Sequence, residues 1–98
     1  MHSLKCAPDA KQFANISDAI ASGLIDAALV ASPGPFHEDV LLPIIAAGLP
    51  VLCEKPFTIN AKEAREMKAA ADANGVALME AMWSRFLPHY AQVREIVA

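Results

Sequence analysis

Glu54, Lys55 and Pro56 place a carboxylate, an amine and a rigid ring after the short apolar run 49–52 and Cys53. A lysine at the carboxyl end of a buried strand can reach a ligand, because open α/β sheets bind ligands outside these strand ends. Its ammonium group can then stabilise negative charge that develops on a substrate oxygen. Pro56 fixes its own φ and favours an extended Lys55, which limits where the ammonium group can point. From position alone, a solvated loop lysine is the alternative.

Three short apolar segments are predicted to be the strands that position this turn: Asp26–Ala31, Val51–Cys53 and Val76–Met79. Helical patterns alternate with them, over Ser17–Ser22, Phe36–Ala47, the segment between Asn60 and Gly75, and His89–Ala98. Strands that alternate with helices pair in parallel through right-handed crossovers. Residues 82–88 are predicted to be a loop.

Local signals define the ends of two of these helices. Asn60 and Glu63 have the spacing of a capping box, and Gly75 is predicted to end that helix. Gly48 stands where the C-terminal cap of the preceding helix is expected. Pro43 conflicts with the helical pattern around it, so that helix either starts later or bends there.

The composition excludes several classes of partner. The chain has 98 residues, 55% of them hydrophobic, and a net charge of −3. Because no basic cluster occurs, nucleic acid and anionic membrane are not expected as partners. The apolar runs are much shorter than a membrane span, and no signal peptide is evident. Cys6 and Cys53 lack metal-ligand spacing, which predicts two reduced thiols, no metal site and a cytoplasmic protein.

An ordered set of short motifs gives the chain a family resemblance. A predicted strand precedes Ser32-Pro33 and Phe36-His37, Ala46-Ala47-Gly48 precedes the next strand, and Glu54-Lys55-Pro56 follows it. This pattern resembles the Gfo/Idh/MocA family of NAD(P)-dependent oxidoreductases over about residues 17–98. Residues 79–88, which include Trp83, Arg85 and Phe86, resemble the branch that contains dihydrodiol dehydrogenases and NADP-dependent xylose dehydrogenases.

The resemblance implies an α/β fold, the second half of a Rossmann-type doubly wound parallel sheet with three parallel strands and crossover helices. Residues 1–86 would form the C-terminal half of a dinucleotide-binding domain, and residues 87–98 the first helix of a following substrate domain. The implied reaction transfers hydride between a nicotinamide and a secondary alcohol of a sugar, cyclic polyol or dihydrodiol. Lys55 would be the catalytic residue, lying beside the nicotinamide and bonded to the substrate hydroxyl.

The resemblance also implies which residues bind the cofactor, NAD or NADP, with NADP favoured. They are Ser32, Pro33, His37, Glu54, Pro56, Trp83 and Arg85. Each has a purely structural alternative. Glu54 could pair with Lys55 or cap a turn, and His37 could lie on the surface. Trp83 could be core packing, and Arg85 could form a structural salt bridge.

The first half of the family fold is expected to be missing. Its glycine-rich GxGxxG turn has no counterpart, since the glycines are Gly23, Gly34, Gly48 and Gly75. The predicted strand Asp26–Ala31 would then be an exposed apolar edge. The chain alone is therefore expected to be inactive, to bind NAD(P) weakly or not at all, and to form a homo-oligomer. The alternatives are a non-catalytic, self-associating α/β module and a binding protein that retains the fold without the chemistry.

Overall fold

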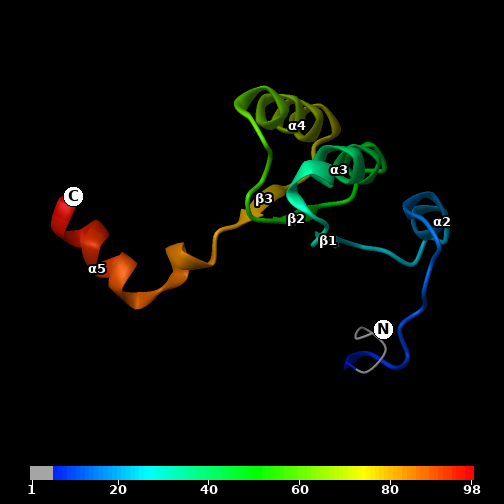
Figure 1. Cartoon of the computed structure of the whole chain (residues 1–98), viewed down its shortest axis with the longest axis horizontal. Helices are drawn as coiled ribbons and strands as arrows, with labels where there is room; N and C mark the ends of the chain where they lie inside the picture. Colours follow the sequence, from blue (N-terminus) through cyan, green and yellow to red (C-terminus); the bar gives the residue numbers. More distant parts are fainter. Residues whose placement is uncertain (1–5) are drawn as a thin grey trace.

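The structure, a computed structural model, describes residues 6–98. Three short strands form one sheet: β1 (Ala28–Val30), β2 (Val51–Glu54) and β3 (Leu78–Ala81). The α-helices are α2 (Ile16–Ala21), α3 (His37–Ala46), α4 (Ala61–Asn74) and α5 (Pro88–Val97). Two 3₁₀ helices, η1 (Gly34–Phe36) and η2 (Trp83–Phe86), precede α3 and α5. Figure 1 shows α3 and α4 together on one face of the sheet.

The strands are parallel and lie in the order β1-β2-β3. This confirms the predicted half of a doubly wound sheet. The register places Val30 beside Cys53, and Cys53 beside Glu80. Because successive side chains alternate between the faces of a strand, these three residues form one row on the face that α3 and α4 cover.

The core lies between the sheet and these two helices. Its buried hydrophobic residues are Val30, Leu41, Ile44, Ile45, Val51, Cys53, Met67 and Ala71. Leu41 and Ile45 come from α3 and Met67 from α4, each fully buried. Helical spacing of these side chains gives each helix one apolar face that the sheet can bury.

The opposite face of the sheet is not covered by the part of the chain that the structure describes. Leu29, Leu52 and Met79 form a cross-strand row there and are 67%, 38% and 41% exposed. We call this row the open face. The first strand is therefore exposed in two ways: it lies at the edge of the sheet, and its Leu29 side chain lies on the open face.

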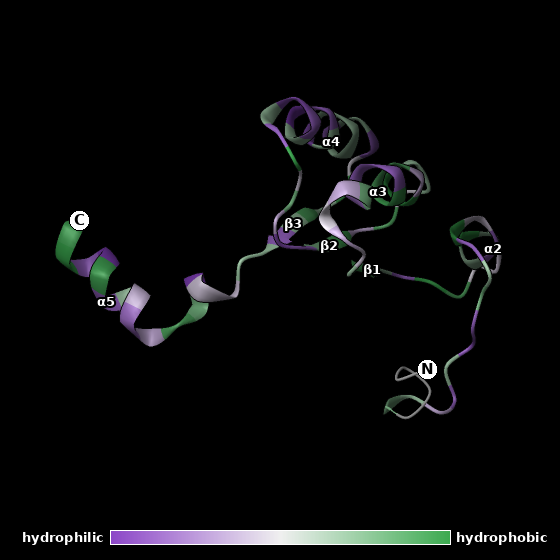
Figure 2. Cartoon of the chain, viewed as in Figure 1, coloured by the Kyte–Doolittle hydropathy of each residue, from purple (hydrophilic) through white to green (hydrophobic). Residues whose placement is uncertain are grey.

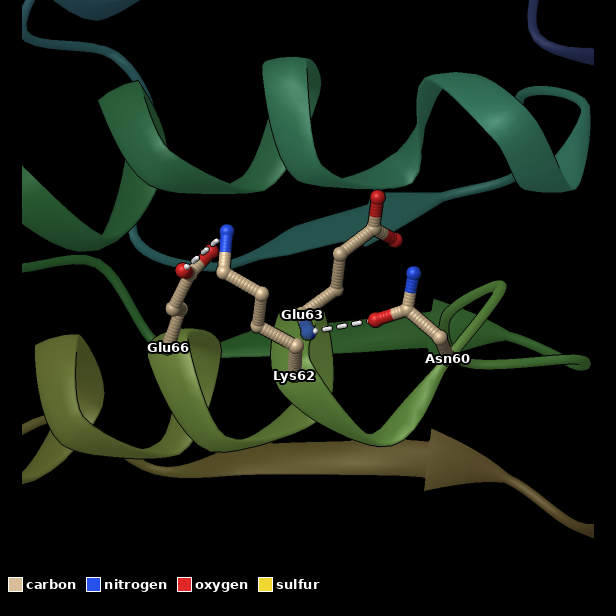
Figure 3. A network of polar contacts seen from close by, with 4 residues as sticks. All are labelled: Asn60, Lys62, Glu63 and Glu66. Atoms are coloured by element: carbon tan, nitrogen blue, oxygen red, sulfur yellow. Dashed lines mark hydrogen bonds and ion pairs between the residues drawn. The ribbon is translucent and has the colours of Figure 1, made fainter.

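Helix α4 begins as the sequence predicts. The Asn60 side chain accepts a hydrogen bond from the Glu63 amide at 2.9 Å (Figure 3). The Glu63 carboxylate accepts a hydrogen bond from the amide of Ile59, at 3.3 Å, rather than from that of Asn60 as in a capping box. From the first turn of α4 to the second, Lys62 and Glu66 form an exposed ion pair at 3.2 Å (Figure 3).

Several predicted boundaries were wrong for local reasons. The third strand begins at Leu78, not Val76, because the Val76 amide bonds to the carbonyl of Ala71 and closes the end of α4, where Gly75 has φ +64°. The predicted loop 82–88 contains η2. Helix α3 starts at His37 and continues through Pro43, so a later start is wrong.

Helix α5 lies apart from the sheet and its two covering helices (Figure 1). It carries both hydrophobic and hydrophilic residues along its length (Figure 2). Val93, Ile96 and Val97 are exposed. The Arg94 side chain joins α5 to η2 by donating to the carbonyl of Arg85 at 3.2 Å.

Candidate functional site

Two turns lie against each other at the carboxyl ends of β1 and β2. The first carries Ser32, Pro33 and Gly34, and the second carries Lys55 and Pro56. A Cβ atom placed on Gly34 would lie 3.7 Å from Cγ of Pro56, an ordinary van der Waals contact. Parallel strands bring such turns to one edge of a sheet, where α/β proteins bind ligands.

The Lys55 side chain is exposed, whereas its backbone is held. Its amide donates to the Glu54 carboxylate at 2.7 Å, and the Lys55–Pro56 peptide bond is cis. Glu54 therefore caps the turn, one of the alternatives considered for it. Within residues 6–98, the ion pairs join Lys62 to Glu66 and Lys68 to Asp72, and none involves the Lys55 ammonium group.

His37 is buried, with 1% of its surface exposed, so a surface position is wrong. Its Nε2 atom lies 2.7 Å from the carbonyl oxygen of Ser32, in the first turn. Its Nδ1 atom lies 3.0 Å from the carbonyl oxygen of Phe57, just after the second turn. The imidazole ring, at the first residue of α3, thus contacts both the first turn and the residue that follows the second turn.

Cys53 lies under the same ring, with its Sγ atom 3.3 Å from Nδ1 of His37. Burial raises the pKa of the Cys53 thiol to about 11, and the nearby charges of Glu80 and Glu54 add to the effect. Since only the thiolate is nucleophilic, Cys53 is a packing residue and not a reactive one.

This raised pKa gives a labelling prediction. At pH 8, iodoacetamide should modify the exposed Cys6 at the rate of an ordinary thiol. Cys53 should react at least about 100 times more slowly, because its pKa of about 11 leaves little thiolate at pH 8 and its burial restricts access of the reagent. Mass spectrometry of the peptides measures both rates in one sample, and urea should equalise them. Rapid labelling of Cys53 in the folded chain would contradict its burial.

Glu80, at the carboxyl end of β3, was not predicted as a site residue. Its carboxylate accepts a hydrogen bond from the Phe57 amide at 2.7 Å. The sequence offered a signal in an acidic residue near the end of a predicted strand. The sequence does not specify the strand register, which places Glu80 beside Cys53 and therefore near the second turn.

Trp83 lies on the open-face side and is 65% exposed, so core packing is not its role within residues 6–98. A cavity of about 410 Å³ is lined by Leu52, Glu54, Met79, Ala81, Trp83 and Phe86. It brings Glu54 and Trp83 together. Arg85 is not among the residues that line this cavity, although its guanidinium lies 5.8 Å from the centre of the Phe86 ring, which does.

Ser32 holds a hydrogen-bonding group that is not satisfied. Its Oγ atom is buried and has no hydrogen-bond partner in the described part of the chain. Buried hydroxyl groups are normally paired, so this one needs an explanation. An unsatisfied hydroxyl at the carboxyl end of β1 is therefore a candidate ligand-binding group.

Within residues 6–98, no three His, Cys, Asp or Glu side chains gather in a way that could hold a metal ion. No helix in this range has the length and apolar character needed to cross a membrane.

Comparison with known proteins gives a consistent result. Residues 2–82 match the family model described as an oxidoreductase family with an NAD-binding Rossmann fold (GFO_IDH_MocA). The scyllo-inositol 2-dehydrogenase (NADP(+)) IolU of Bacillus subtilis is 43% identical over 86 residues, which cover 88% of this chain and 26% of the relative. Trans-1,2-dihydrobenzene-1,2-diol dehydrogenase of Mus musculus is 48% identical over 73 residues, 74% of this chain and 22% of that protein.

Solved structures agree in fold. The crystal structure of GenD2 from gentamicin A biosynthesis, in complex with NAD, superposes with a TM-score of 0.88 at 30% identity. The match covers 99% of this chain and 28% of that one. The chain thus spans about a quarter of the length of the relatives that it matches.

Proposed function

Since this chain belongs to the Gfo/Idh/MocA family of oxidoreductases with an NAD-binding Rossmann fold, we propose that it forms the Lys55-bearing part of an NAD(P)-dependent dehydrogenase. A bound nicotinamide supplies the hydride acceptor or donor. Lys55 holds the substrate oxygen by a hydrogen bond. As the alcohol is oxidised, a general base takes the hydroxyl proton while hydride leaves the carbon, and Lys55 stabilises the negative charge on the oxygen. In the reverse direction Lys55 polarises the carbonyl.

The observation that carries this proposal is the state of Lys55. Its side chain is exposed at the carboxyl ends of the strands, its amide is bonded to Glu54, and its ammonium group forms no ion pair within residues 6–98. A fixed backbone and an uncommitted cation suit a residue that must meet an oxygen whose charge changes during the reaction.

The residues present fit a dinucleotide. The unsatisfied Ser32 hydroxyl and the neighbouring Pro33 would hold the ribose and diphosphate side. Glu54 and Pro56 would lie along the nicotinamide ribose. Trp83 and Arg85 would approach the nicotinamide end, and His37 would act from beneath through the Ser32 carbonyl.

The choice of cofactor and substrate is part of this proposal. One relative is named for NADP and one related structure holds NAD, and we favour NADP because the more similar sequence is the NADP enzyme. The relatives are named for an inositol and for a dihydrodiol. Both compounds have a ring carbon that bears a secondary hydroxyl, and the adjacent ring carbon bears a second hydroxyl. We propose a vicinal hydroxyl of this kind, on a cyclic polyol, sugar or dihydrodiol, as the substrate.

Domain division, assembly and location extend the proposal. Residues 1–86 would belong to the dinucleotide-binding domain, and α5, within residues 87–98, would begin the next. The exposed row Leu29, Leu52 and Met79 supports a homo-oligomer that covers the open face. Light scattering that finds only monomers over a wide concentration range would contradict it. Two unpaired cysteines support a cytoplasmic location.

The test is a chimaera in which this chain replaces the matching segment of the Bacillus subtilis relative. We expect the chimaera to bind NADPH, seen by a shift of its fluorescence, and to reduce NADP⁺ with scyllo-inositol as substrate. The 98-residue chain alone should bind NADPH weakly. A folded chimaera that binds NADPH and transfers no hydride to or from any polyol would overturn the proposal in favour of a non-catalytic module.

A further inference from the structure

We propose that Glu80 and His37 are positioning residues that hold the backbone of Phe57 from two sides and thereby fix the turn that presents Lys55. This inference rests on the proposed function of Lys55. It assigns roles to two side chains that do not touch a substrate. We call the Phe57 amide and carbonyl groups, with these two partners, the Phe57 anchor.

The Phe57 anchor uses both backbone groups of one residue. The Phe57 amide donates to a Glu80 carboxylate oxygen at 2.7 Å. The Phe57 carbonyl oxygen lies 3.0 Å from Nδ1 of His37. Phe57 is itself half-buried and packs against the core. The residue that follows Lys55 and Pro56 is therefore fixed to β3 on one side and to α3 on the other.

Glu80 is placed for this task by the sheet. It belongs to the covered row with Val30 and Cys53, whereas its neighbour Ala81 stands opposite Glu54 on the other face. A carboxylate that accepts from an amide makes a charge-assisted hydrogen bond, about twice as strong as a neutral one. No basic side chain in residues 6–98 forms an ion pair with Glu80, so its charge is directed at the turn.

His37 links the anchor to the other turn. Its second nitrogen faces the carbonyl oxygen of Ser32 at 2.7 Å, so the same ring contacts both turns of the site. The ring is nearly fully buried and cannot turn toward solvent without leaving both carbonyls. A neutral imidazole carries one N–H, so it donates to one of these two carbonyl oxygens and makes only a packing contact with the other. Displacement of either turn still disturbs this buried ring.

The expected consequence is on chemistry rather than on cofactor affinity. Lys55 is two residues from the anchor, and its exposed side chain follows the backbone of the turn. A displacement of a reacting group by about 1 Å can cost about 100-fold in rate. Glu80 contacts the second turn directly and the first turn only through His37, so the Ser32 and Pro33 contacts to the cofactor should change less than the position of Lys55. Loss of Glu80 should therefore lower kcat more than it weakens NADPH binding.

The experiment compares Glu80→Ala with Glu80→Gln in the chimaera and in the 98-residue chain. In the chimaera, Glu80→Ala should lower kcat about 10- to 100-fold and change the Kd for NADPH less than about threefold. Glu80→Gln retains a side-chain oxygen that can accept from the Phe57 amide, so it should restore kcat to within about threefold. Glu63→Ala is the matched control, because Glu63 accepts from the amide of Ile59 near the same turn. It should leave kcat unchanged.

Amide hydrogen exchange in the 98-residue chain keeps the test independent of activity. The Phe57 amide should be protected in the parent chain and in Glu80→Gln, and should exchange at least about ten times faster in Glu80→Ala. Equal exchange in all three would overturn the anchor whatever the kinetics show. A chimaera that binds NADPH without turnover, together with the expected exchange pattern, would overturn the proposed function and leave the anchor standing. Full kcat in Glu80→Ala would overturn the positioning role.

Discussion

Replacing Lys55 with alanine in the chimaera should lower kcat about 100- to 1,000-fold while the Kd for NADPH changes little. The ammonium group would act on charge that develops only in the transition state, and loss of one such donor commonly costs this much. The Lys55 side chain is exposed and is not part of the core, so its removal should not unfold the protein. Steady-state kinetics, with fluorescence titration of NADPH, measures both quantities.

Two further variants make this result specific to position 55. Lys62→Ala removes an exposed lysine whose ion pair lies on α4, and it should leave kcat within about twofold. Lys55→Arg keeps the charge in a planar, longer group and should recover only part of the rate. Turnover unchanged in Lys55→Ala would refute the role assigned to this lysine.

The second large effect is on stability. Leu41→Ala should lower the free energy of unfolding by about 2–5 kcal/mol, because it leaves a cavity beneath a fully buried position of α3. Single domains are commonly stable by only about 5–15 kcal/mol, so this variant should melt far below the parent chain. Urea denaturation followed by circular dichroism measures the difference.

Leu29→Ala is the control, since it makes the same chemical change on the open face. Leu29 is 67% exposed, so its truncation should cost less than about 1 kcal/mol in a monomer. An equal loss in both variants would mean that the open face is covered in solution. Comparison of the two at several protein concentrations separates a partner copy from intramolecular packing.

The parts of the fold that follow local rules could be predicted. The Asn60 cap, the glycine at the end of α4 and the alternation of strands with helices were all confirmed. Boundaries that depend on competition between neighbouring elements were not. The start of β3 shifted because a helix end already uses the Val76 amide. The bounds of α3 agree with the predicted Phe36–Ala47 to within one residue, and of the two alternatives at Pro43 only the later start is excluded.

The candidate site divides in the same way. The turn that carries Lys55 was predicted from an apolar run and a proline. His37 contacts Phe57 across 20 positions of the sequence, and Glu80 contacts Phe57 across 23. Both contacts form only when the elements that carry these residues pack together. Such pairings depend on register and helix placement, which one sequence does not specify. The roles of the individual cofactor-binding residues stay predictions.

The Phe57 anchor has a consequence for how this chain can change over time. Both partners hold main-chain atoms, so neither depends directly on the side chain at position 57. Drift among apolar residues there is compatible with the anchor, whereas proline would remove the amide that Glu80 accepts from. Substitutions at positions 37 and 80 should therefore be constrained more tightly than at the residue they hold. In related proteins that retain the lysine at position 55, we expect histidine at position 37 and glutamate or glutamine at position 80 to be retained together.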